Sequence, residues 1–540
     1  MATYGIDLGT TYSCISKFEG GQPIVIKNEL DENSTASAVY FGEDGSVLVG
    51  DEAKGYVQTE GYRVVQFVKR EIGKTSVPHE IDGKEYNAIE ISALILKKMA
   101  KYAHDQGENV KDVVITCPAY FGNEERDATK KAGILAGFNV LEIINEPTAA
   151  AISYAFSNKG LKDETVVVYD LGGGTFDVTV LDIKIKPNGV PSCQVLASDG
   201  DDQLGGKDWD EILYNLLESK IREENGLDSL DSEGQFAIRS IVEKTKKSLS
   251  NRESMNVNVI INGERMSCEI TRGEFEAATA HLVQKTTDCL DRVLNLPNVK
   301  SHKLDKILLV GGSSNMPVIS RTIKAKYGEA GAMNAVVGGL TEAGVDMYTE
   351  TIPVVFSDPE TAVSKGAAIY SNMLKKAGYG NQDEVIEIHD IASRTFGVDC
   401  FINNAKDLVI DNLVFKGKEI PCSVTSTYNP VEDNQTGVQF YIYESMTTDR
   451  RIPVDINFDT GEVNNPDPRF GIKLLGSLVL PFPPNVTRDV DLIVTMTARA
   501  SGINVKCRNT MNNDEVEVEI EFANNQVDMD NNHIDALEIE

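Results

Sequence analysis

Short apolar runs alternate with longer amphipathic stretches along residues 1–380. For example, an apolar run at residues 113–116 is followed by an amphipathic stretch at 124–138 and a second apolar run at 140–144. Short apolar runs are typical of buried strands, and the longer stretches are typical of helices that cover a sheet. The pattern therefore predicts an α/β fold for the first 380 residues.

Beyond residue 385 the apolar positions repeat with a period of two, which is typical of antiparallel strands with one buried face. In residues 515–522 apolar side chains alternate with glutamates. Breaks rich in Pro and Asn, at 464–468 and 481–484, separate further runs of this kind. We therefore expect a β-sandwich of about 130 residues. A second alternating run sets Val438, Phe440 and Ile442 against Gln439, Tyr441 and Tyr443.

Charge and cysteine content narrow the possible functions. The 540 residues carry 83 acidic and 52 basic side chains, a net charge of −31, which argues against binding to nucleic acid or to a membrane surface, because both need clustered Lys and Arg. No apolar run is long enough to span a membrane, and the strand-like run at Tyr4 leaves no room for a signal peptide. Eight scattered cysteines without a C-x-x-C predict reduced thiols in a cytoplasmic protein.

A strand that ends in Asp and runs into a glycine turn occurs twice, at residues 5–11 and 168–175. A third glycine turn at 311–314 follows a strand without the Asp. Glycines after a strand let backbone N–H groups converge on an anion, and neighbouring Thr hydroxyls add donors. Because Asp7 and Asp170 would repel a phosphate directly, the pair implies an intervening hydrated Mg²⁺. The duplication predicts two similar lobes that close on a shared phosphate-bearing ligand.

Other local patterns are weaker. Residues 73–75 resemble the end of a P-loop but lack its first glycine, and no G-x-G-x-x-G follows a strand, which argues against a dinucleotide cofactor. The helix expected at 236–251 carries a polar stripe. Solvated surface is the plainer interpretation of such a stripe unless a nucleotide lies beside it. The stripe consists of Glu243, Lys246, Lys247 and Ser250.

Four motifs resemble the signatures of the seventy-kilodalton heat-shock (heat shock protein 70) chaperone family: DLGTTYS at 7–13, VITCPAYF at 114–121, INEPTAAA at 144–151 and DLGGGTFD at 170–177. The resemblance covers nearly the whole chain. It implies an α/β, actin-like and hexokinase-like two-lobed ATPase domain at 1–380, an interdomain linker at 381–392, and an all-β sandwich peptide-binding domain at 393–524. A short acidic tail at 525–540 would stand in place of the helical lid, as in a lidless or truncated member.

The resemblance implies an ATP-dependent chaperone that binds extended apolar segments of unfolded proteins during folding and stress response. It implies ATP or ADP with Mg²⁺, and K⁺ as a further candidate cation, and the partners would be a J-domain co-chaperone and a nucleotide-exchange factor. The catalytic residues would be Lys69, Asp7, Glu146, Asp170 and Thr175, with Asp7 and Asp170 holding Mg²⁺ through water. The nucleotide-binding residues would be Gly9, Thr10, Thr11, Tyr12, Gly172, Gly173, Gly174, Gly205, Gly206, Glu243, Lys246, Lys247, Ser250, Gly311, Gly312, Ser313, Asn315 and Glu360.

Two further groups of residues follow from the same resemblance. For the peptide-binding group, the competing interpretation is that its side chains fill the core of the sandwich. The interdomain coupling residues would be Pro118, Arg126, Ile386, Ile388 and Asp390. The peptide-binding residues would be Val398, Phe401, Tyr428, Val431, Val438 and Phe440.

The chain departs from the family pattern at several positions. Asn315 replaces an Arg and Glu360 an Asp, so we expect weaker nucleotide binding. Lys207 replaces an acidic residue and residues 327–350 form an insertion, without an assigned role. The linker at 386–390 reads IEIHD in place of consecutive leucines. With half the apolar side chains to bury, interdomain coupling and stimulation by peptide should weaken, although an edge strand needs only its backbone and one apolar face.

Residues 523–540 contain too few apolar positions to form the helical lid, so bound peptide should dissociate quickly. Two other classes of function are open. A non-hydrolysing or uncoupled chaperone-like scaffold should have decayed phosphate loops, whereas these loops are intact. A sugar kinase or filament-forming ATPase can share the superfold but lacks the β domain.

Overall fold

The computed structural model describes residues 2–74, 78–158, 162–261, 263–328, 351–378, 385–403, 406–499 and 502–521, together with residues 534, 537 and 539. Most of the predicted insertion at 327–350, the start of the predicted linker at 381–384 and most of the predicted tail at 525–540 lie outside these ranges. Among the described residues, no helix is long and apolar enough to cross a bilayer. All eight cysteines are free thiols, as predicted.

Residues 2–145, here called lobe I, form a six-stranded sheet in the order β11-β10-β1-β2-β3, with β4 paired to β2. A three-stranded sheet, β6-β5-β7, and a hairpin, β8-β9, lie beside it. The strands are β1 (Thr3–Asp7), β2 (Tyr12–Glu19), β3 (Gln22–Ile26), β4 (Thr35–Ala36), β5 (Ala38–Phe41), β6 (Val47–Val49), β7 (Val64–Gln66), β8 (His79–Ile81), β9 (Lys84–Tyr86), β10 (Asp112–Cys117) and β11 (Asn139–Asn145). The helices are α1 (Asp51–Gly55), α2 (Val57–Glu60), η1 (Gly61–Arg63), η2 (Val68–Arg70), α3 (Ala88–Asp105) and α4 (Asn123–Leu135).

Residues 164–356, here called lobe II, are built on a seven-stranded sheet in the order β18-β17-β12-β13-β14-β19-β22, whose last two strands come from later in the chain. The strands of lobe II are β12 (Glu164–Leu171), β13 (Phe176–Ile185), β14 (Pro191–Asp201), β17 (Lys306–Val310) and β18 (Val354–Phe356), with the separate hairpin β15 (Ser254–Ile261) and β16 (Glu264–Thr271). Its helices are α6 (Gly206–Asn225), α7 (Ser232–Leu249), α8 (Arg272–Ala278), α9 (Ala280–Leu294), α10 (Pro297–Lys300), η3 (Gly312–Asn315) and α11 (Pro317–Tyr327).

The two main sheets share one strand arrangement, so the duplication seen in the sequence has a structural counterpart. In lobe I, β1 pairs antiparallel with β2 and parallel with β10. In lobe II, β12 pairs antiparallel with β13 and parallel with β17. Asp7 and Asp170 therefore end equivalent central strands, and both strand ends face the space between the lobes.

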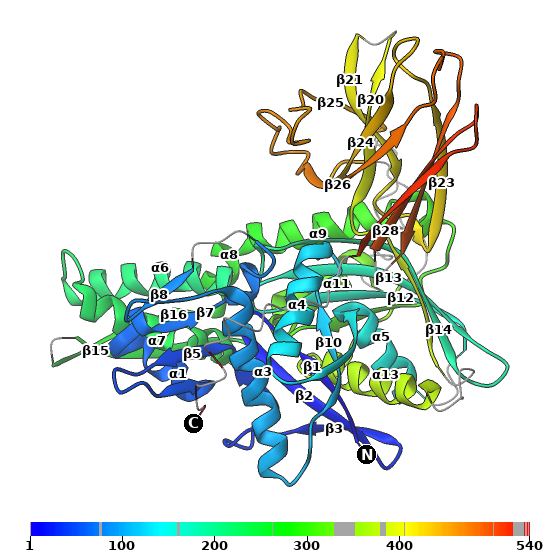
Figure 1. Ribbon diagram of the computed structural model, residues 1–540. Helices are drawn as coiled ribbons and strands as arrows, with labels where there is room; N and C mark the ends of the chain where they lie inside the picture. Colours follow the sequence, from blue (N-terminus) through cyan, green and yellow to red (C-terminus); the bar gives the residue numbers. More distant parts are fainter. Residues whose placement is uncertain are drawn as a thin grey trace, which may run out of the picture.

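Two helices, α5 (Glu146–Ser157) and α13 (Ala362–Gly378), pack together between the lobes (Figure 1). Their contact surfaces consist of small residues. A side chain at Gly366 would collide with the backbone of Ala149, and one at Gly5 would collide with α13 at Ala368. Glycine and alanine therefore let these backbones approach closely, and the close packing fixes the strand ends of one lobe opposite those of the other.

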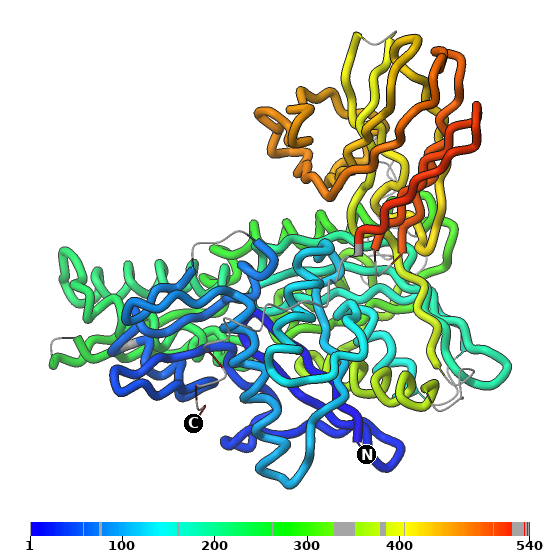
Figure 2. The backbone as a smooth tube through the Cα atoms, viewed as in Figure 1, coloured from blue at the N-terminus to red at the C-terminus, as the bar shows by residue number. Residues whose placement is uncertain are grey.

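Residues 392–521, here called the β domain, form a five-stranded sheet, β25-β21-β20-β24-β26, and a four-stranded sheet, β23-β27-β28-β29. The sheets face each other across a shared apolar core that includes Ile442, Val494 and Val505. In Figures 1 and 2 the β domain projects from the α/β part of the molecule. Its strands are β20 (Thr395–Ile402), β21 (Asp407–Val414), β22 (Glu419–Ile420), β23 (Cys422–Tyr428), β24 (Gly437–Ser445), β25 (Arg451–Pro453), β26 (Lys473–Pro481), β27 (Leu492–Arg499), β28 (Gly502–Asn509) and β29 (Glu515–Glu521).

The sequence predicted that one face of residues 438–443 is buried and the other exposed, and only the buried face agrees with the structure. Tyr441 and Tyr443, expected on the outer face of β24, are buried in a second small core with Ile410 and Ile452. The long connection between β25 and β26 covers them: the Tyr441 hydroxyl donates to the Phe458 carbonyl at 2.5 Å, and the Tyr443 hydroxyl donates to a backbone carbonyl of the same connection at 2.7 Å. Period-two alternation identified this strand but not the layer that covers its other face.

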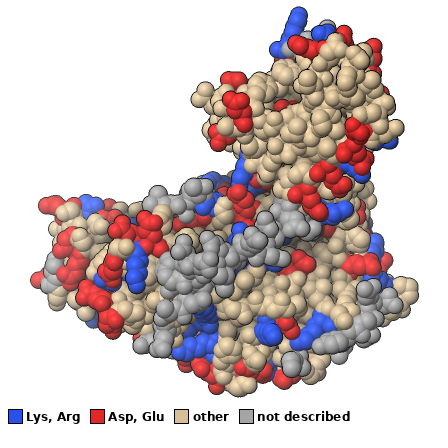
Figure 3. All heavy atoms as spheres, viewed as in Figure 1, with Lys and Arg blue, Asp and Glu red and all other residues tan. Residues whose placement is uncertain are grey.

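Acidic side chains are spread over both the α/β part and the β domain on the face seen in Figure 3, in keeping with the net charge of −31. Lys and Arg occur on this face as small separate groups. On the described part of this face no extended basic surface is visible.

Asp399, on β20, should make the stability of the β domain depend on pH. Its side chain is 7% exposed and accepts a 2.6 Å hydrogen bond from the Tyr441 backbone N–H, and burial raises its pKa from 3.8 to about 6. Between these two values the folded state keeps a proton that the unfolded state has lost, so the free energy of unfolding should fall as pH rises. Asp399→Asn should remove about 2 kcal/mol of this fall between about pH 4 and pH 6.5.

The measurement is unfolding of the protein in urea at both pH values. Pulsed hydrogen exchange of the amides of β20 and β24 monitors the unfolding. Asp407→Asn, on the exposed start of neighbouring β21, is the matched control and should keep the wild-type dependence. The same pH slope in Asp399→Asn as in wild type would contradict the prediction.

Candidate functional site

A cavity of about 510 Å³ opens between the lobes. All three glycine turns line it, together with side chains from η2, α5 and α7. Of the predicted nucleotide-site residues, Gly174 and Gly205 do not reach the lining, because they pack against each other behind it. The predicted residues in the lining are Asp7, Gly9, Thr10, Thr11, Tyr12, Lys69, Glu146, Asp170, Gly172, Gly173, Thr175, Gly206, Glu243, Lys246, Lys247, Ser250, Gly311, Gly312, Ser313, Asn315 and Glu360.

The first two glycine turns lie against each other across the cavity wall. A side chain at Gly173 would collide with Thr11, and one at Gly174 would collide with Thr10. The Thr11 hydroxyl is buried and has no hydrogen-bond partner within the described part of the chain. Closely apposed glycine turns with an unsatisfied hydroxyl fit a bound anion such as phosphate.

Four carboxyl groups lie around one ammonium group, and three of them line the cavity with it. Lys69, on η2, is 4% exposed and forms an ion pair with Glu146, the first residue of α5. Asp7 ends β1, Asp170 is the last residue but one of β12, and Asp177 is the second residue of β13 and pairs with Asp170. One Asp177 oxygen is buried with no hydrogen-bond partner among the described residues. The cluster therefore has more negative than positive charge.

Burial and this charge imbalance shift the titration of the carboxyl groups. Burial and the Glu146 carboxylate raise the pKa of Asp7 to about 7, against the opposing effect of Lys69. The pKa of Asp170 and that of Asp177 lie well above the ordinary value for the same two reasons. No three His, Cys, Asp or Glu side chains in the described ranges converge closely enough to bind a metal directly. Mg²⁺ usually keeps several of its waters and is held by one or two carboxylates, and the Asp7 and Asp170 side chains line the cavity.

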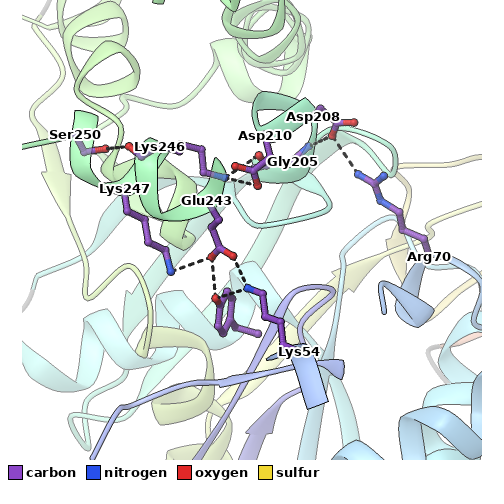
Figure 4. Close-up of polar contacts among 11 residues, drawn as sticks. Lys54, Arg70, Gly205, Asp208, Asp210, Glu243, Lys246, Lys247 and Ser250 are labelled. Atoms are coloured by element: carbon purple, nitrogen blue, oxygen red, sulfur yellow. Dashed lines mark hydrogen bonds and ion pairs between the residues drawn. The ribbon is translucent and has the colours of Figure 1, made fainter. Parts of the chain in front are cut away.

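The polar stripe on α7 lines the cavity. In Figure 4, Glu243 and Lys247 point toward Lys54 of lobe I. Glu243 accepts a 2.8 Å hydrogen bond from the Tyr12 hydroxyl and forms ion pairs with Lys54 and with Lys247, the latter at 2.9 Å. Burial would raise the pKa of Glu243, but the two lysines outweigh it and lower the pKa to about 2. Because Tyr12 and Lys54 belong to lobe I, this cluster connects the lobes and is not a solvated surface.

Lys246 has partners within lobe II. Its ammonium donates to the Gly206 carbonyl and to the Asp210 carboxylate, both at 2.8 Å (Figure 4). Asp210 was not predicted from the sequence, although it lies four residues beyond Gly206 at the start of α6. Ser250 is the C-terminal cap residue of α7 and lines the cavity. Asn315 and Glu360, which replace the residues expected from the resemblance, also line the cavity and are exposed.

Arg70 makes a second connection between the lobes that the sequence did not indicate. Its Nε donates to the Gly174 carbonyl at 2.9 Å, and its guanidinium pairs with Asp208 at 3.2 Å (Figure 4). Lys207, the basic replacement at the start of α6, lines the cavity with its ammonium 4.5 Å from the centre of the Phe67 ring. Basic side chains thus gather beside the second glycine turn.

With ADP as the test ligand, loss of the Lys54 ammonium should speed release of the ligand from the cavity. Lys54 and Glu243 join the lobes across the cavity mouth, and a partly exposed ion pair of this kind is worth about 1 kcal/mol, so Lys54→Ala should release ADP about fivefold faster. Stopped-flow displacement of a fluorescent ADP gives the rate. Arg239→Ala, which breaks the Arg239–Glu211 pair within lobe II, is the control and should not change it. Equal release from Lys54→Ala and wild type would refute the role of this contact.

Two predicted coupling residues meet through a third that was not predicted. Arg126, on α4, donates to the side-chain oxygen of Asn145, and Asn145 Nδ2 donates to Asp390 at 2.8 Å. Burial raises the pKa of Asp390, and Arg126 opposes that effect. Asn145 is the residue before Glu146, so a three-residue path leads from the cavity to the linker. Pro118 is buried at the end of β10.

The linker forms β19 (Glu387–Ile391), which lies between β14 and β22 in the lobe II sheet. It pairs parallel with β14 and antiparallel with β22 of the β domain. Ile386 is buried and Ile388 packs on the same core beneath the sheet, while Glu387 points outward and pairs with Lys186 at 2.7 Å. Alternate apolar residues are therefore enough to pack this strand against the core.

Direct contacts between α4 and the β domain lie beside the linker. Asn123 donates to Glu444 at 3.2 Å, Arg394 lies 3.9 Å from Glu125, and Lys473 pairs with Glu124. All three contacts use the first turn of α4, which also carries Arg126. The position of the β domain is therefore tied to the same helix as the coupling residue.

The predicted peptide-binding residues occupy different environments in the β domain. Val398 is fully buried and Phe440 is 4% exposed, so both fill the core between the sheets, and Tyr428 and Val438 pack at its edge. Val431 is half-buried in the loop before β24. Phe401 differs because it is 42% exposed and stacks on Phe458 with ring centres 6.1 Å apart. In this arrangement only Phe401 of the six offers a largely exposed apolar surface.

Comparison with known proteins identifies the class to which this cavity and fold belong. The family model described as Hsp70 protein matches residues 3–79 and 73–336. Two relatives named Chaperone protein DnaK, from Thermosipho melanesiensis and Thermosipho africanus, are each 35% identical to the chain over 450 residues. The match covers 82% of this chain and 70% and 69% of the relatives. The chain therefore belongs to the Hsp70 family, and the resemblance inferred from its four motifs is confirmed.

Proposed function

We propose that the protein is an ATP-dependent chaperone that binds extended apolar segments of unfolded polypeptides and couples this binding to ATP hydrolysis. The observation that carries the proposal is the cavity between the lobes, where two apposed glycine turns, Lys69 and the carboxyl groups of Asp7, Glu146 and Asp170 come together. A cavity of about 510 Å³ is also of the size that small-molecule ligands and cofactors occupy.

The residues of the cavity have separable roles in the proposed reaction. Backbone N–H groups of the glycine turns and the hydroxyls of Thr10, Thr11 and Thr175 would orient the phosphates. Bound Mg²⁺, held through water by Asp7 and Asp170, would neutralise phosphate charge. Lys69 would place positive charge beside the transferring phosphoryl group, and its ion pair would keep Glu146 oriented toward the attacking water.

Coupling to the β domain is proposed to run through the linker. The path from Glu146 through Asn145 to Asp390 joins the cavity to β19, and β19 joins the β domain through β22. The exposed Phe401 face is the proposed contact for an apolar peptide. A J-domain co-chaperone, a nucleotide-exchange factor, K⁺ and a cytoplasmic location complete the proposal by family analogy.

Single-turnover hydrolysis of ATP, with and without an excess of an extended Leu-rich peptide, tests the proposal. Hydrolysis that requires Mg²⁺ and is accelerated by the peptide is the expected result. Hydrolysis indifferent to peptide would favour an uncoupled scaffold, and nucleotide binding without hydrolysis would favour a non-hydrolysing one. An Ala-rich peptide of equal length and net charge is the matched control, because it lacks large apolar side chains.

A further inference from the structure

Three apolar residues from the acidic C-terminal stretch pack on lobe I. Ile534 is 0% exposed and belongs to the same core as Val47 and Val49 of β6, and Leu537 and Ile539 pack against that core. Ile539 also forms a parallel β-bridge with Val47. Figures 1 and 2 accordingly place the end of the chain beside α1 and α3, not beside the β domain from which this stretch emerges.

Two lysines of α3 hold the backbone of this stretch. Lys97 donates to the Ile534 carbonyl at 3.3 Å, and Lys101 donates to the Ile539 carbonyl at 2.9 Å. The lysines are one helical turn apart, on the same face of α3. The sequence around the apolar positions, HIDALEIE at 533–540, is acidic. Apolar anchors, strand pairing and complementary charge thus act together, as in peptides that add to the edge of a sheet.

We propose that Ile534, Leu537 and Ile539 are the anchors of a docking motif for a groove of lobe I between β6 and α3, and that this contact tethers the β domain to lobe I independently of the linker. The groove lies along β6, an open edge of the β6-β5-β7 sheet. An added segment covers the edge strand's unpaired backbone groups. The opposite edge strand, β7, ends at Gln66, directly before Phe67 and the η2 turn that carries Lys69.

The tether follows from chain length. β29 ends at Glu521 in the β domain, and the next twelve residues lead to Ile534 on lobe I. Thirteen steps along the chain reach at most about 45 Å, so the docked motif sets an upper limit on the separation of the β domain from lobe I. With β19 as the first, the chain makes two connections between the β domain and the α/β part, and either one keeps the other at high effective concentration.

Substitution of both anchors in the full chain tests the docking. Ile534→Asp combined with Ile539→Asp should make amide hydrogen exchange in β6 and α3 about tenfold faster, because the edge and groove become exposed. Ile260→Asp, at an exposed isoleucine of β15, is the matched control and should leave β6 and α3 unchanged. Equal exchange in all three proteins would overturn the proposal.

A labelled peptide of residues 531–540 tests whether the groove is a binding site. Fluorescence anisotropy should detect binding to the doubly substituted chain, with a dissociation constant below about 1 mM, and no binding to wild type, whose groove is filled. Faster exchange without peptide binding would mean that the substitutions only destabilise lobe I, and would overturn the docking site.

The tether itself is tested by releasing the other connection. Ile388→Asp removes the buried apolar contact of β19. If the motif is a tether, the radius of gyration from small-angle X-ray scattering should increase most when Ile388→Asp is combined with the two tail substitutions, and less with either alone. An increase in Ile388→Asp alone that equals the combined one would show that docking does not restrain the β domain.

Discussion

Lys69→Ala should slow single-turnover hydrolysis of ATP by about a thousandfold, because removal of one preorganised charge from a buried site typically costs 10²–10³ in rate. Lys69 is the only ammonium or guanidinium in the described cluster formed with Asp7, Glu146, Asp170 and Asp177, and it is 4% exposed. Its loss would leave the carboxyl groups of this cluster without a cation among them in the described part of the chain. It also frees Glu146 from the ion pair that orients it.

Nucleotide binding should suffer much less than hydrolysis in this variant. The glycine turns and the α7 stripe lie elsewhere in the cavity and are unchanged, so the dissociation constant of ATP should change by less than about tenfold. Equilibrium binding of a fluorescent ATP analogue and rapid-quench hydrolysis separate the two quantities. Lys74→Ala, at a lysine of the same segment that is 44% exposed and pairs with Asp202, is the control and should hydrolyse ATP normally. A loss of less than tenfold in Lys69→Ala would contradict a catalytic role.

The glycine turns and the carboxylates at strand ends were predictable because each is a local pattern. A strand followed by glycines fixes its own turn, and two such copies imply a common ligand. The partners of these residues were not predictable, because they come together only through the packing of distant elements. Lys54 reaches Glu243 from a separate lobe, and Asn145 stands between Arg126 and Asp390. A lone Lys or Asn in the sequence carries no sign of such a partner.

The linker illustrates how far periodicity can be used. Alternate apolar residues were expected to weaken docking relative to a run of leucines, because fewer side chains would be buried. In the structure β19 uses its backbone to pair with β14 and β22 and buries one face only. Its outward residues would be exposed whatever their identity. Counting apolar residues therefore overestimates how much buried apolar surface is lost relative to a run of leucines. Whether the coupling itself survives is a separate question, which Asp390 addresses.

The C-terminal stretch makes a packing contact that the sequence did not predict. Its acidic composition and sparse apolar residues predicted a short acidic tail that could not form the helical lid. Ile534 is nevertheless buried in lobe I. Three apolar anchors at alternate or near-alternate positions are too few to predict a helix, a strand or a partner surface from sequence. Only the open edge of β6, which the fold creates, gives them a place to bind.

Asp390→Ala should abolish the acceleration of hydrolysis by an apolar peptide while leaving the rate without peptide within about twofold of wild type. Asp390 is tied to Asn145 at 2.8 Å and lies in the field of Arg126, all within the interface of the linker with α4 and α5. Removing one partner of a buried charged network costs roughly 3–5 kcal/mol, enough to lower the docked fraction of β19 by more than a hundredfold. Lys69 and the glycine turns are untouched, so the reaction itself should proceed.

The matched control is Glu387→Ala, on the outward face of the same strand, where the exposed pair with Lys186 contributes little. Arg126→Ala combined with Asp390→Ala should be no worse than either alone, because both substitutions break one path. Single-turnover hydrolysis with and without peptide supplies all four comparisons. Full stimulation in Asp390→Ala would show that the signal bypasses the linker. The contact of Asn123 with Glu444, which joins α4 to β24 directly, would then be the route to examine, since it leaves β19 out of the path.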